Sequence, residues 1–153
     1  MKLSDFFSNY FTVRAEMLDA VKNLTQEQLD WKPERHPNSI GKLLAHIAEA
    51  EYWWITLVAA QKEQYAKGCF DQFKEGRSLD ANLALLESTF NDMRQYLESE
   101  GIEDWDEVFY DVLGRKEKAS KRWLIWHVVE HQARHRGQIF MLMRMQELDV
   151  PDV

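Results

Sequence analysis

Apolar residues recur along this chain at spacings of three and four, which is the repeat of a helix packed along one side. No run of alternating β-branched residues, which would indicate strands, competes with that repeat. The pattern predicts four long helices, at residues 4–24, 39–61, 79–100 and 120–148. The third has apolar residues at alternating steps of four and three, as in the seam of a bundle, at Leu79, Leu83, Leu86, Phe90, Met93 and Leu97.

Residues that favour helix ends mark several of these boundaries. Ser4 and Ser120 stand where the first and fourth helices are expected to begin, and Gly101 stands where the third is expected to end. Thr25 and Gln28 have the spacing of a capping box. They predict a short helical turn between the first two long helices.

The lengths of the connections between the long helices indicate whether neighbouring helices are parallel or antiparallel. Residues 62–77 and 102–118 are longer than the short loops that join neighbouring antiparallel helices. Some helices are therefore expected to run parallel and to be joined by crossovers. The prediction for residues 1–153 is a single all-α domain, a four-helix bundle with long crossover connections.

The composition fits packed helices and narrows the range of partners. Six tryptophans, with only six glycines and three prolines, suit such a fold. A net charge of -7 disfavours nucleic acid and anionic lipid, because both are negatively charged. The basic residues between Arg115 and Arg122 surround Glu117 and precede a helix, which favours a solvated loop over an anion-binding site.

The sequence points neither to secretion nor to a membrane. Cys69 is the only cysteine, so an intramolecular disulfide is not possible. Charged residues interrupt the apolar pattern of the first 16 positions, unlike a signal-peptide core. The longest uncharged stretch of the second helix, residues 52–61, is about half a bilayer crossing. We expect a cytoplasmic protein.

Three of the five histidines, His127, His131 and His135, fall at four-residue intervals in the fourth predicted helix. Residues four apart lie about 6 Å apart along a helix. Two such imidazoles can therefore converge on one metal ion, at metal–nitrogen distances of about 2.0–2.1 Å. Residues eight apart are separated by about 12 Å, which one ion does not bridge. The site takes either His131 with His135 or His127 with His131, and spacing alone does not choose.

His46 is the candidate third ligand, because it lies on the wide apolar stripe of the second helix. His36 lies in a proline-containing loop and is expected to be solvated. Three neutral imidazoles leave at least one coordination position for water or substrate, as in catalytic metal sites. Their joint occurrence on inward faces favours a metal site over hydrogen-bonded core histidines. Imidazole donors suit zinc, nickel, copper and iron.

Polar residues near the candidate ligands have predicted roles. Gln138 lies three residues after His135, so its amide can hydrogen-bond a bound water or a ligand imidazole. Glu51 lies on the apolar stripe of the second helix, turned away from the histidine of that helix, and should have a structural partner. Salt bridges are expected for Arg134 and Arg136.

The fourth helix has a second apolar face, which exceeds what one bundle core requires. This face predicts a homodimer interface made of Ile125, Val129, Phe140 and Met143.

Three segments of the sequence are characteristic when taken together. They are LTQEQLDWKP after the first helix, LLAHIAEAEYWW around His46, and HVVEHQARHRGQI, continued by FMLMR, in the fourth helix. With these segments the chain resembles, over nearly its whole length, the DinB-like family of YfiT-type metalloenzymes. The resemblance implies a four-helix bundle, commonly dimeric, with nickel or zinc held by His46, His131 and His135. His127 matches no required ligand, so it is placed with Gln138 around the ligands.

The resemblance further implies a metal-dependent enzyme that acts on a small molecule, as an S-transferase using a low-molecular-weight thiol or as a hydrolase. The sequence has no Gly-x-Ser-x-Gly motif, and Cys69 has no histidine near it, so the metal would supply the chemistry. No catalytic side chain is assigned. Trp53, Leu57 and aromatic residues of the first helix are expected to line an apolar pocket. The alternative is a non-catalytic, stress-linked metal-binding bundle.

Overall fold

The computed structural model describes residues 1–152, which form helices and one small hairpin. None of the helices in this range is long and apolar enough to cross a membrane. The elements in chain order are α1 (Leu3–Phe6), α2 (Ser8–Val21), α3 (Gln26–Asp30), α4 (Ile40–Glu51), the π-helix η1 (Tyr52–Ala59), the 3-10 helix η2 (Cys69–Phe73), α5 (Leu79–Ser99), β1 (Phe109–Asp111), β2 (Lys118–Ser120) and α6 (Lys121–Met145).

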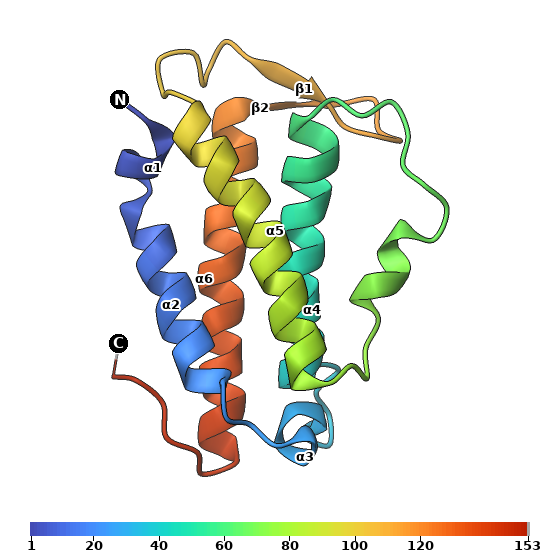
Figure 1. Ribbon diagram of the computed structural model, residues 1–153, viewed down its shortest axis with the longest axis vertical. Helices are drawn as coiled ribbons and strands as arrows, with labels where there is room; N and C mark the ends of the chain where they lie inside the picture. Colours follow the sequence, from blue (N-terminus) through green and yellow to red (C-terminus); the bar gives the residue numbers. More distant parts are fainter. Residues whose placement is uncertain (153) are drawn as a thin grey trace.

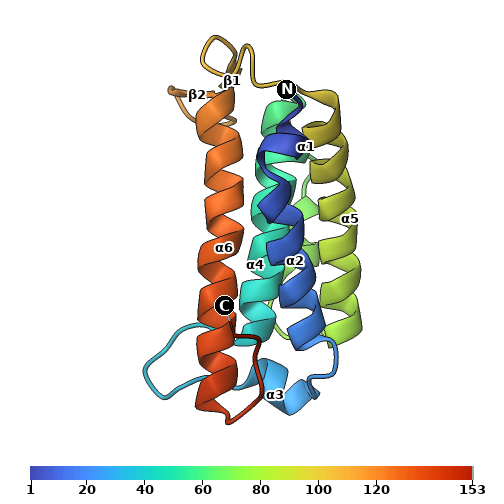
Figure 2. The ribbon, with the colours of Figure 1, turned by 90° about the vertical axis from the view of Figure 1, so that its left-hand side faces the viewer.

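Four long helices, α2, α4, α5 and α6, lie side by side as a bundle (Figures 1 and 2). In Figure 1, α2 and α6 run downward, whereas α4 with η1 and α5 run upward. The connection from η1 to α5 passes along the outside of the bundle to its other end, so α4 and α5 are parallel neighbours. The prediction of an all-α four-helix bundle with a crossover connection is confirmed.

The connection between α5 and α6 is not a crossover, because it stays at one end of the bundle (Figure 1). It contains the antiparallel pair of β1 and β2, with Phe109 opposite Ser120. The sequence pattern does not predict these strands, because each has three residues and only the middle one, Tyr110 or Ala119, is buried. Three residues are too few for an alternation of apolar and polar positions to be recognised.

The basic segment from Arg115 to Arg122 is more ordered than the predicted solvated loop. It includes β2 and the first turn of α6, and its Lys121 is only 1% exposed. The Lys121 ammonium donates to Glu100 at 2.6 Å and to Asp104 at 2.8 Å. The prediction of a solvated loop was therefore wrong for this lysine, because its partners, at the end of α5 and in the connection that follows, lie far away in the sequence.

The start of the first helix also differs from its prediction. The pattern predicts one helix from Ser4, but the chain forms α1 and then α2, with a break at Phe7. Ser4 lies inside α1, and the N-cap residue Lys2 makes no side-chain capping bond. Instead, the Leu3 N–H donates to the carbonyl of Glu100 at 2.9 Å. A contact across the fold replaces the local cap.

The other predicted helix starts agree with the structure. Thr25 and Gln28 form the predicted capping box at the beginning of α3. The hydroxyls of Ser39, Ser78 and Ser120 each accept from a backbone N–H three residues later, at the beginnings of α4, α5 and α6. Each serine satisfies a donor that a helix start would otherwise leave without a partner.

The predicted helix at residues 39–61 has two parts. The chain is α-helical through Glu51 and then continues as the π-helix η1. A π-helix is a rare, wider form that occurs frequently at functional sites. The sequence pattern shows one helix here, because both forms are helical and large apolar side chains cover most of the circumference of η1.

Residues of the predicted dimer interface lie in the core of the chain itself. Ile125, Phe140 and Met143 are buried, and Val129 packs partly buried against the same core. Helix α6 is apolar on two faces because it contacts α2 on one side and α4 with η1 on another. The structure therefore corrects this prediction, since the second apolar face belongs to the bundle and not to a dimer interface.

Glu51 has the structural partners that its place on the apolar stripe requires. Its carboxylate accepts from the Arg14 guanidinium and the Tyr10 hydroxyl, and from the Thr89 hydroxyl at 2.6 Å. All four side chains are buried, so Arg14 rather than water balances the charge of Glu51. Burial, together with the adjacent carboxylate, raises the pKa of Tyr10 well above its usual value. The predicted structural role of Glu51 is confirmed.

Candidate metal centre

The three histidines implied as ligands come together from two helices. His46 lies on α4, and His131 and His135 lie one turn apart on α6. The His131 Nε2 atom is 3.1 Å from His46 Nε2 and 3.2 Å from His135 Nε2. Each of the three rings has a nitrogen within 4.8 Å of a nitrogen of the other two. Three imidazoles therefore converge on one point.

The separation of these nitrogens fits a shared metal ion. Two nitrogens bound about 2.05 Å from one ion lie roughly 2.9–3.4 Å apart for bond angles between octahedral and tetrahedral values. The observed separations of 3.1 and 3.2 Å fall within that range. The donor set is also suitable, because neutral imidazoles bind borderline divalent metals.

The other nitrogens of two rings are held by neighbouring side chains. His135 Nδ1 lies 2.6 Å from Gln138 Oε1, which is an acceptor, so this ring nitrogen carries the proton. The Nε2 atom of His135 is then free to coordinate. His46 Nδ1 lies 3.3 Å from Glu49 Oε2 in the same manner. Such contacts orient metal-binding imidazoles in proteins.

The sequence predicts one of these two contacts. A hydrogen bond from Gln138 to a ligand imidazole is among its predicted roles, whereas Glu49 is a residue that the sequence interpretation missed. The signal for Glu49 is its position three residues after His46, which places both side chains on one face of α4.

The three rings differ in their exposure to solvent. His131 is 7% exposed, His135 is partly buried, and the side chain of His46 is 48% exposed. The prediction that all three face inward was wrong for His46, which lies at the opening of the site. Burial, reinforced by the neighbouring His135 and His46, lowers the pKa of His131 to about 3. Burial also lowers the pKa of His135, so both α6 rings are neutral at pH 7.

His127 does not join the three converging rings. Its ring stacks on Trp123, with centroids 4.8 Å apart and planes 7° apart, and its centroid is 5.8 Å from that of His131. Burial lowers its pKa. Of the two pairs that the spacing allows, the structure brings only His131 with His135 to His46.

A cavity of about 500 Å³ opens beside the histidines. Its lining includes the aromatic residues Trp53, Trp54 and Phe70, together with His46, Glu49, His127 and His131. Trp53 lines the cavity as predicted. Leu57 and the aromatic residues of α1 and α2 do not line this cavity, so that part of the prediction was wrong.

A further cavity of about 400 Å³ reaches the histidines from another side. Its lining is more polar, with Asn38, Lys42 and Glu75, and it includes His135. His46 and Glu49 line both cavities. The two cavities therefore share part of their lining at the candidate metal centre.

The two arginines that flank His135 in the sequence form salt bridges, as predicted. Arg134 pairs with Glu130 one turn earlier on α6, and Arg136 pairs with Glu16 of α2 at 2.5 Å. Neither arginine lines the cavities beside the histidines.

The fold and the histidines together define a class of protein, an all-α bundle in which two helices present three imidazoles that could hold a metal ion. Within that class, the sequence model of the DinB superfamily matches residues 10–139. The chain belongs to the DinB superfamily. The family resemblance drawn from the sequence is confirmed.

Solved structures of DinB-like proteins share the fold. One, from Bacillus cereus ATCC 10987, is similar with a TM-score of 0.69 at 19% identity, over 99% of this chain and 97% of that chain. Another, YjoA from Bacillus subtilis, is similar with a TM-score of 0.67 at 20% identity, over 95% of this chain and 94% of that chain. No curated protein matches the chain.

Proposed function

We propose that the protein binds one divalent metal ion through His46, His131 and His135 and uses it to act on a small molecule. The observation that carries this proposal is the convergence of three imidazoles beside a cavity, with His131 Nε2 3.1 Å from His46 Nε2 and 3.2 Å from His135 Nε2. Nickel and zinc are the proposed ions, because imidazole donors suit both and the family resemblance implies them.

A divalent ion at this point would act as a Lewis acid and lower the pKa of a bound water or thiol. The chain's own residues would hold and shape the site. Gln138 and Glu49 fix the orientation of two ligand rings through their Nδ1 atoms. Trp53 and Phe70 form an apolar wall that limits the access of water to the reacting atoms.

Glu49 is the residue best placed to move a proton in this site. One of its carboxylate oxygens contacts His46, the other makes no hydrogen bond within residues 1–152, and the side chain lines both cavities. An incoming thiol or water would lose its proton as it becomes a nucleophile, and we propose that Glu49 accepts it.

The two cavities at this site favour thiol transfer over hydrolysis. In a thiol transfer, a sulfur–carbon bond forms, the bond to the leaving group breaks, and the thiol proton passes to Glu49. That reaction brings two organic molecules to one centre, and the two cavities that meet at His46 provide room for both. Hydrolysis needs room for one organic molecule and a water.

Metal analysis by mass spectrometry tests the site itself. The protein should be purified without an affinity tag or chelator, beside His131→Ala and the matched control His36→Ala, which changes a loop histidine outside the site. We expect one metal ion per chain in the wild type and in His36→Ala, and none in His131→Ala. Absence of metal from the wild type, with no uptake of offered zinc or nickel, would overturn the proposal.

Spectroscopy and turnover then separate the two reactions. Addition of a small thiol to the nickel or cobalt form should produce a thiolate charge-transfer band if the thiol binds the metal. Turnover of activated esters without any thiol would instead favour a hydrolase. A metal-loaded protein that fails in both assays would leave the alternative of a non-catalytic metal-binding bundle.

A further inference from the structure

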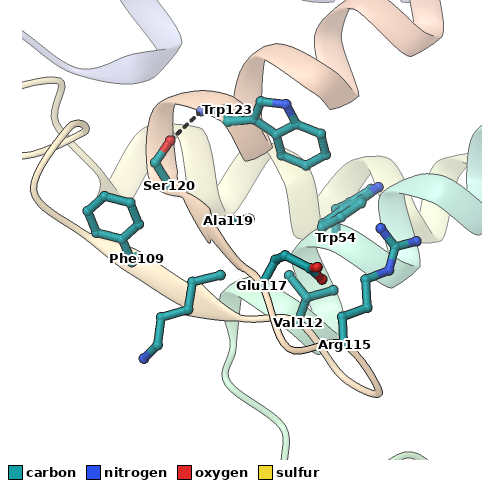
Figure 3. A pocket seen from close by; sticks show the side chains of 9 residues that line it. Trp54, Phe109, Val112, Arg115, Glu117, Ala119, Ser120 and Trp123 are labelled. Atoms are coloured by element: carbon teal, nitrogen blue, oxygen red, sulfur yellow. Dashed lines mark hydrogen bonds between the residues drawn. The ribbon is translucent and has the colours of Figure 1, made fainter.

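A separate cavity of about 430 Å³ lies between the β1–β2 hairpin and the beginning of α6 (Figure 3). Its walls are mainly apolar, with the rings of Trp54, Trp123 and Phe109 and the side chain of Val112. Its volume lies within the usual range for small-molecule sites, and such sites combine apolar walls with a few polar groups. Trp123 and Phe109 are about half exposed, so their rings are open to a ligand.

This hairpin cavity adjoins the cavity beside the histidines. Trp54 and Arg115 line both of them. Trp123 of the hairpin cavity also stacks on His127, which lines the cavity beside the histidines. A molecule held against Trp123 could therefore extend past Trp54 toward His131 without leaving the protein surface.

Arg115 is the polar group at the boundary between the two cavities. It reaches from the loop of the hairpin toward Trp54 (Figure 3). Among residues 1–152 neither Arg115 nor its neighbour Lys116 makes an ion pair, whereas the later cations of the same basic segment are paired, as Lys118–Asp111, Lys121–Glu100, Lys121–Asp104 and Arg122–Asp106. Of the two unpaired cations, only Arg115 lines the cavities. Arg115 is thus a free guanidinium beside an apolar cavity, in a chain whose net charge is -7.

A free guanidinium beside aromatic rings is suited to one kind of ligand. Guanidinium groups bind carboxylates through two parallel hydrogen bonds, and aromatic walls favour an aromatic or apolar body. Glu117 also lines the hairpin cavity and would repel a carboxylate placed beside it. The anionic group therefore belongs at Arg115, near the boundary with the cavity beside the histidines.

We propose that the hairpin cavity binds a small aromatic carboxylate, with its ring against Trp123 and Trp54 and its carboxylate on Arg115. The binding site stands on the hairpin cavity alone, but the role of the ligand as substrate rests on the proposed function. This assigns the electrophilic partner of the thiol to the class of aromatic monoanions.

Calorimetric titration of the metal-free protein with 2-naphthoate tests the site, beside the neutral 2-naphthylmethanol. Arg115→Gln should weaken naphthoate binding by about tenfold or more, because it removes a charge-assisted pair, and should leave the neutral alcohol unchanged. Lys116→Gln is the matched control, since it removes an exposed charge from the adjacent position outside both cavities. Trp123→Ala should weaken the binding of both molecules.

The His131→Ala variant separates this proposal from the metal proposal. Naphthoate should bind this variant as it binds the wild type, because the hairpin cavity contains none of the three converging histidines. That result would stand even if the protein bound no metal. Three outcomes would overturn the inference: no binding of naphthoate, equal weakening in Arg115→Gln and Lys116→Gln, or binding that requires metal and is lost in His131→Ala.

Discussion

Glu49 and Glu51 lie two residues apart on α4 and have opposite surroundings, because a helix turns such positions to nearly opposite sides. Glu51 is buried with Arg14, whereas Glu49 is partly exposed at the opening of the site. Glu51 therefore stabilises the fold, whereas the partly exposed Glu49 can contact a substrate.

Replacement of Glu51 by alanine should destabilise the fold strongly. It would leave the Arg14 guanidinium buried without its counter-charge, which costs about 3–5 kcal/mol of the free energy of unfolding. Urea denaturation measures this loss. Glu49→Ala is the matched control and should change the free energy of unfolding by less than about 1 kcal/mol, because its side chain is partly exposed. Equal effects of the two variants would contradict the assignment.

The pKa of His131 predicts how the stability of the metal-free protein depends on pH. The folded chain resists protonation of this ring down to a pKa of about 3, whereas an unfolded histidine takes up a proton near pH 6.5. The unfolded state therefore binds more protons between these values. The free energy of unfolding is therefore unaffected by this ring above about pH 6.5. Below that pH it falls by roughly 1.4 kcal/mol per pH unit, until the pH approaches 3.

Urea denaturation of chelator-treated protein at pH 7, 6 and 5 checks this slope. The His131→Gln variant should lose stability less steeply on acidification than the wild type. Parallel pH profiles for the two proteins would show that burial of this ring has no such effect.

Spacing alone predicted a pair of histidines on the fourth helix, whereas the choice of His131 with His135 came from the family resemblance. Two histidines four residues apart on a helix share a face whatever the rest of the fold does. The contact of Glu49 with His46 is local too, since the two residues lie three apart on α4, but the sequence interpretation missed it. The exposure of His46 was harder to predict, because it depends on how α4 is rotated against α6. No spacing within α4 records that rotation.

At the scale of elements, the sequence predicted the helix starts that a local serine or threonine caps, as at Thr25 and Ser120. The start of α1 was not, because its first N–H donates to Glu100, far along the chain. The hairpin and η1 were missed for a different reason. Strands of three residues and a change from α- to π-helix leave no distinct hydrophobic repeat.

Ser120 offers a test at this scale, because its hydroxyl caps the helix that carries two of the converging histidines. Ser120→Ala should lower the free energy of unfolding by about 1 kcal/mol, as loss of an N-cap usually does. Ser120→Asp should restore it, since a carboxylate accepts the same N–H bond. A thermal or urea denaturation series measures both, and equal losses in the two variants would show that the cap does not matter.

At the scale of the molecule, we propose that the protein is a homodimer through a different face of α6 than the sequence suggests. The predicted face is buried within the chain, whereas Trp126, Met141 and Met145 of α6 are exposed. Large apolar side chains exposed along one helix often mark a contact surface.

Light scattering at micromolar protein should give twice the mass of one chain. Met141→Lys should shift the mass to that of a monomer, because it places a charge in the contact surface. Tyr65→Lys, which changes an exposed aromatic residue in the crossover connection, should leave the dimer intact. A monomeric mass for the wild type would exclude this arrangement.

His46 and His131 are separated by 85 positions, and the crossover connection lies between them. One shared ion would therefore tie the first half of the chain to the last helix and close a very long loop, which confines the unfolded chain most. The crossover is exposed throughout residues 61–68. A chain cut once in that segment should remain a two-fragment complex while the ion is bound and should separate more readily when a chelator removes it. Size-exclusion chromatography of the cut protein would show whether the bound ion holds the two fragments together.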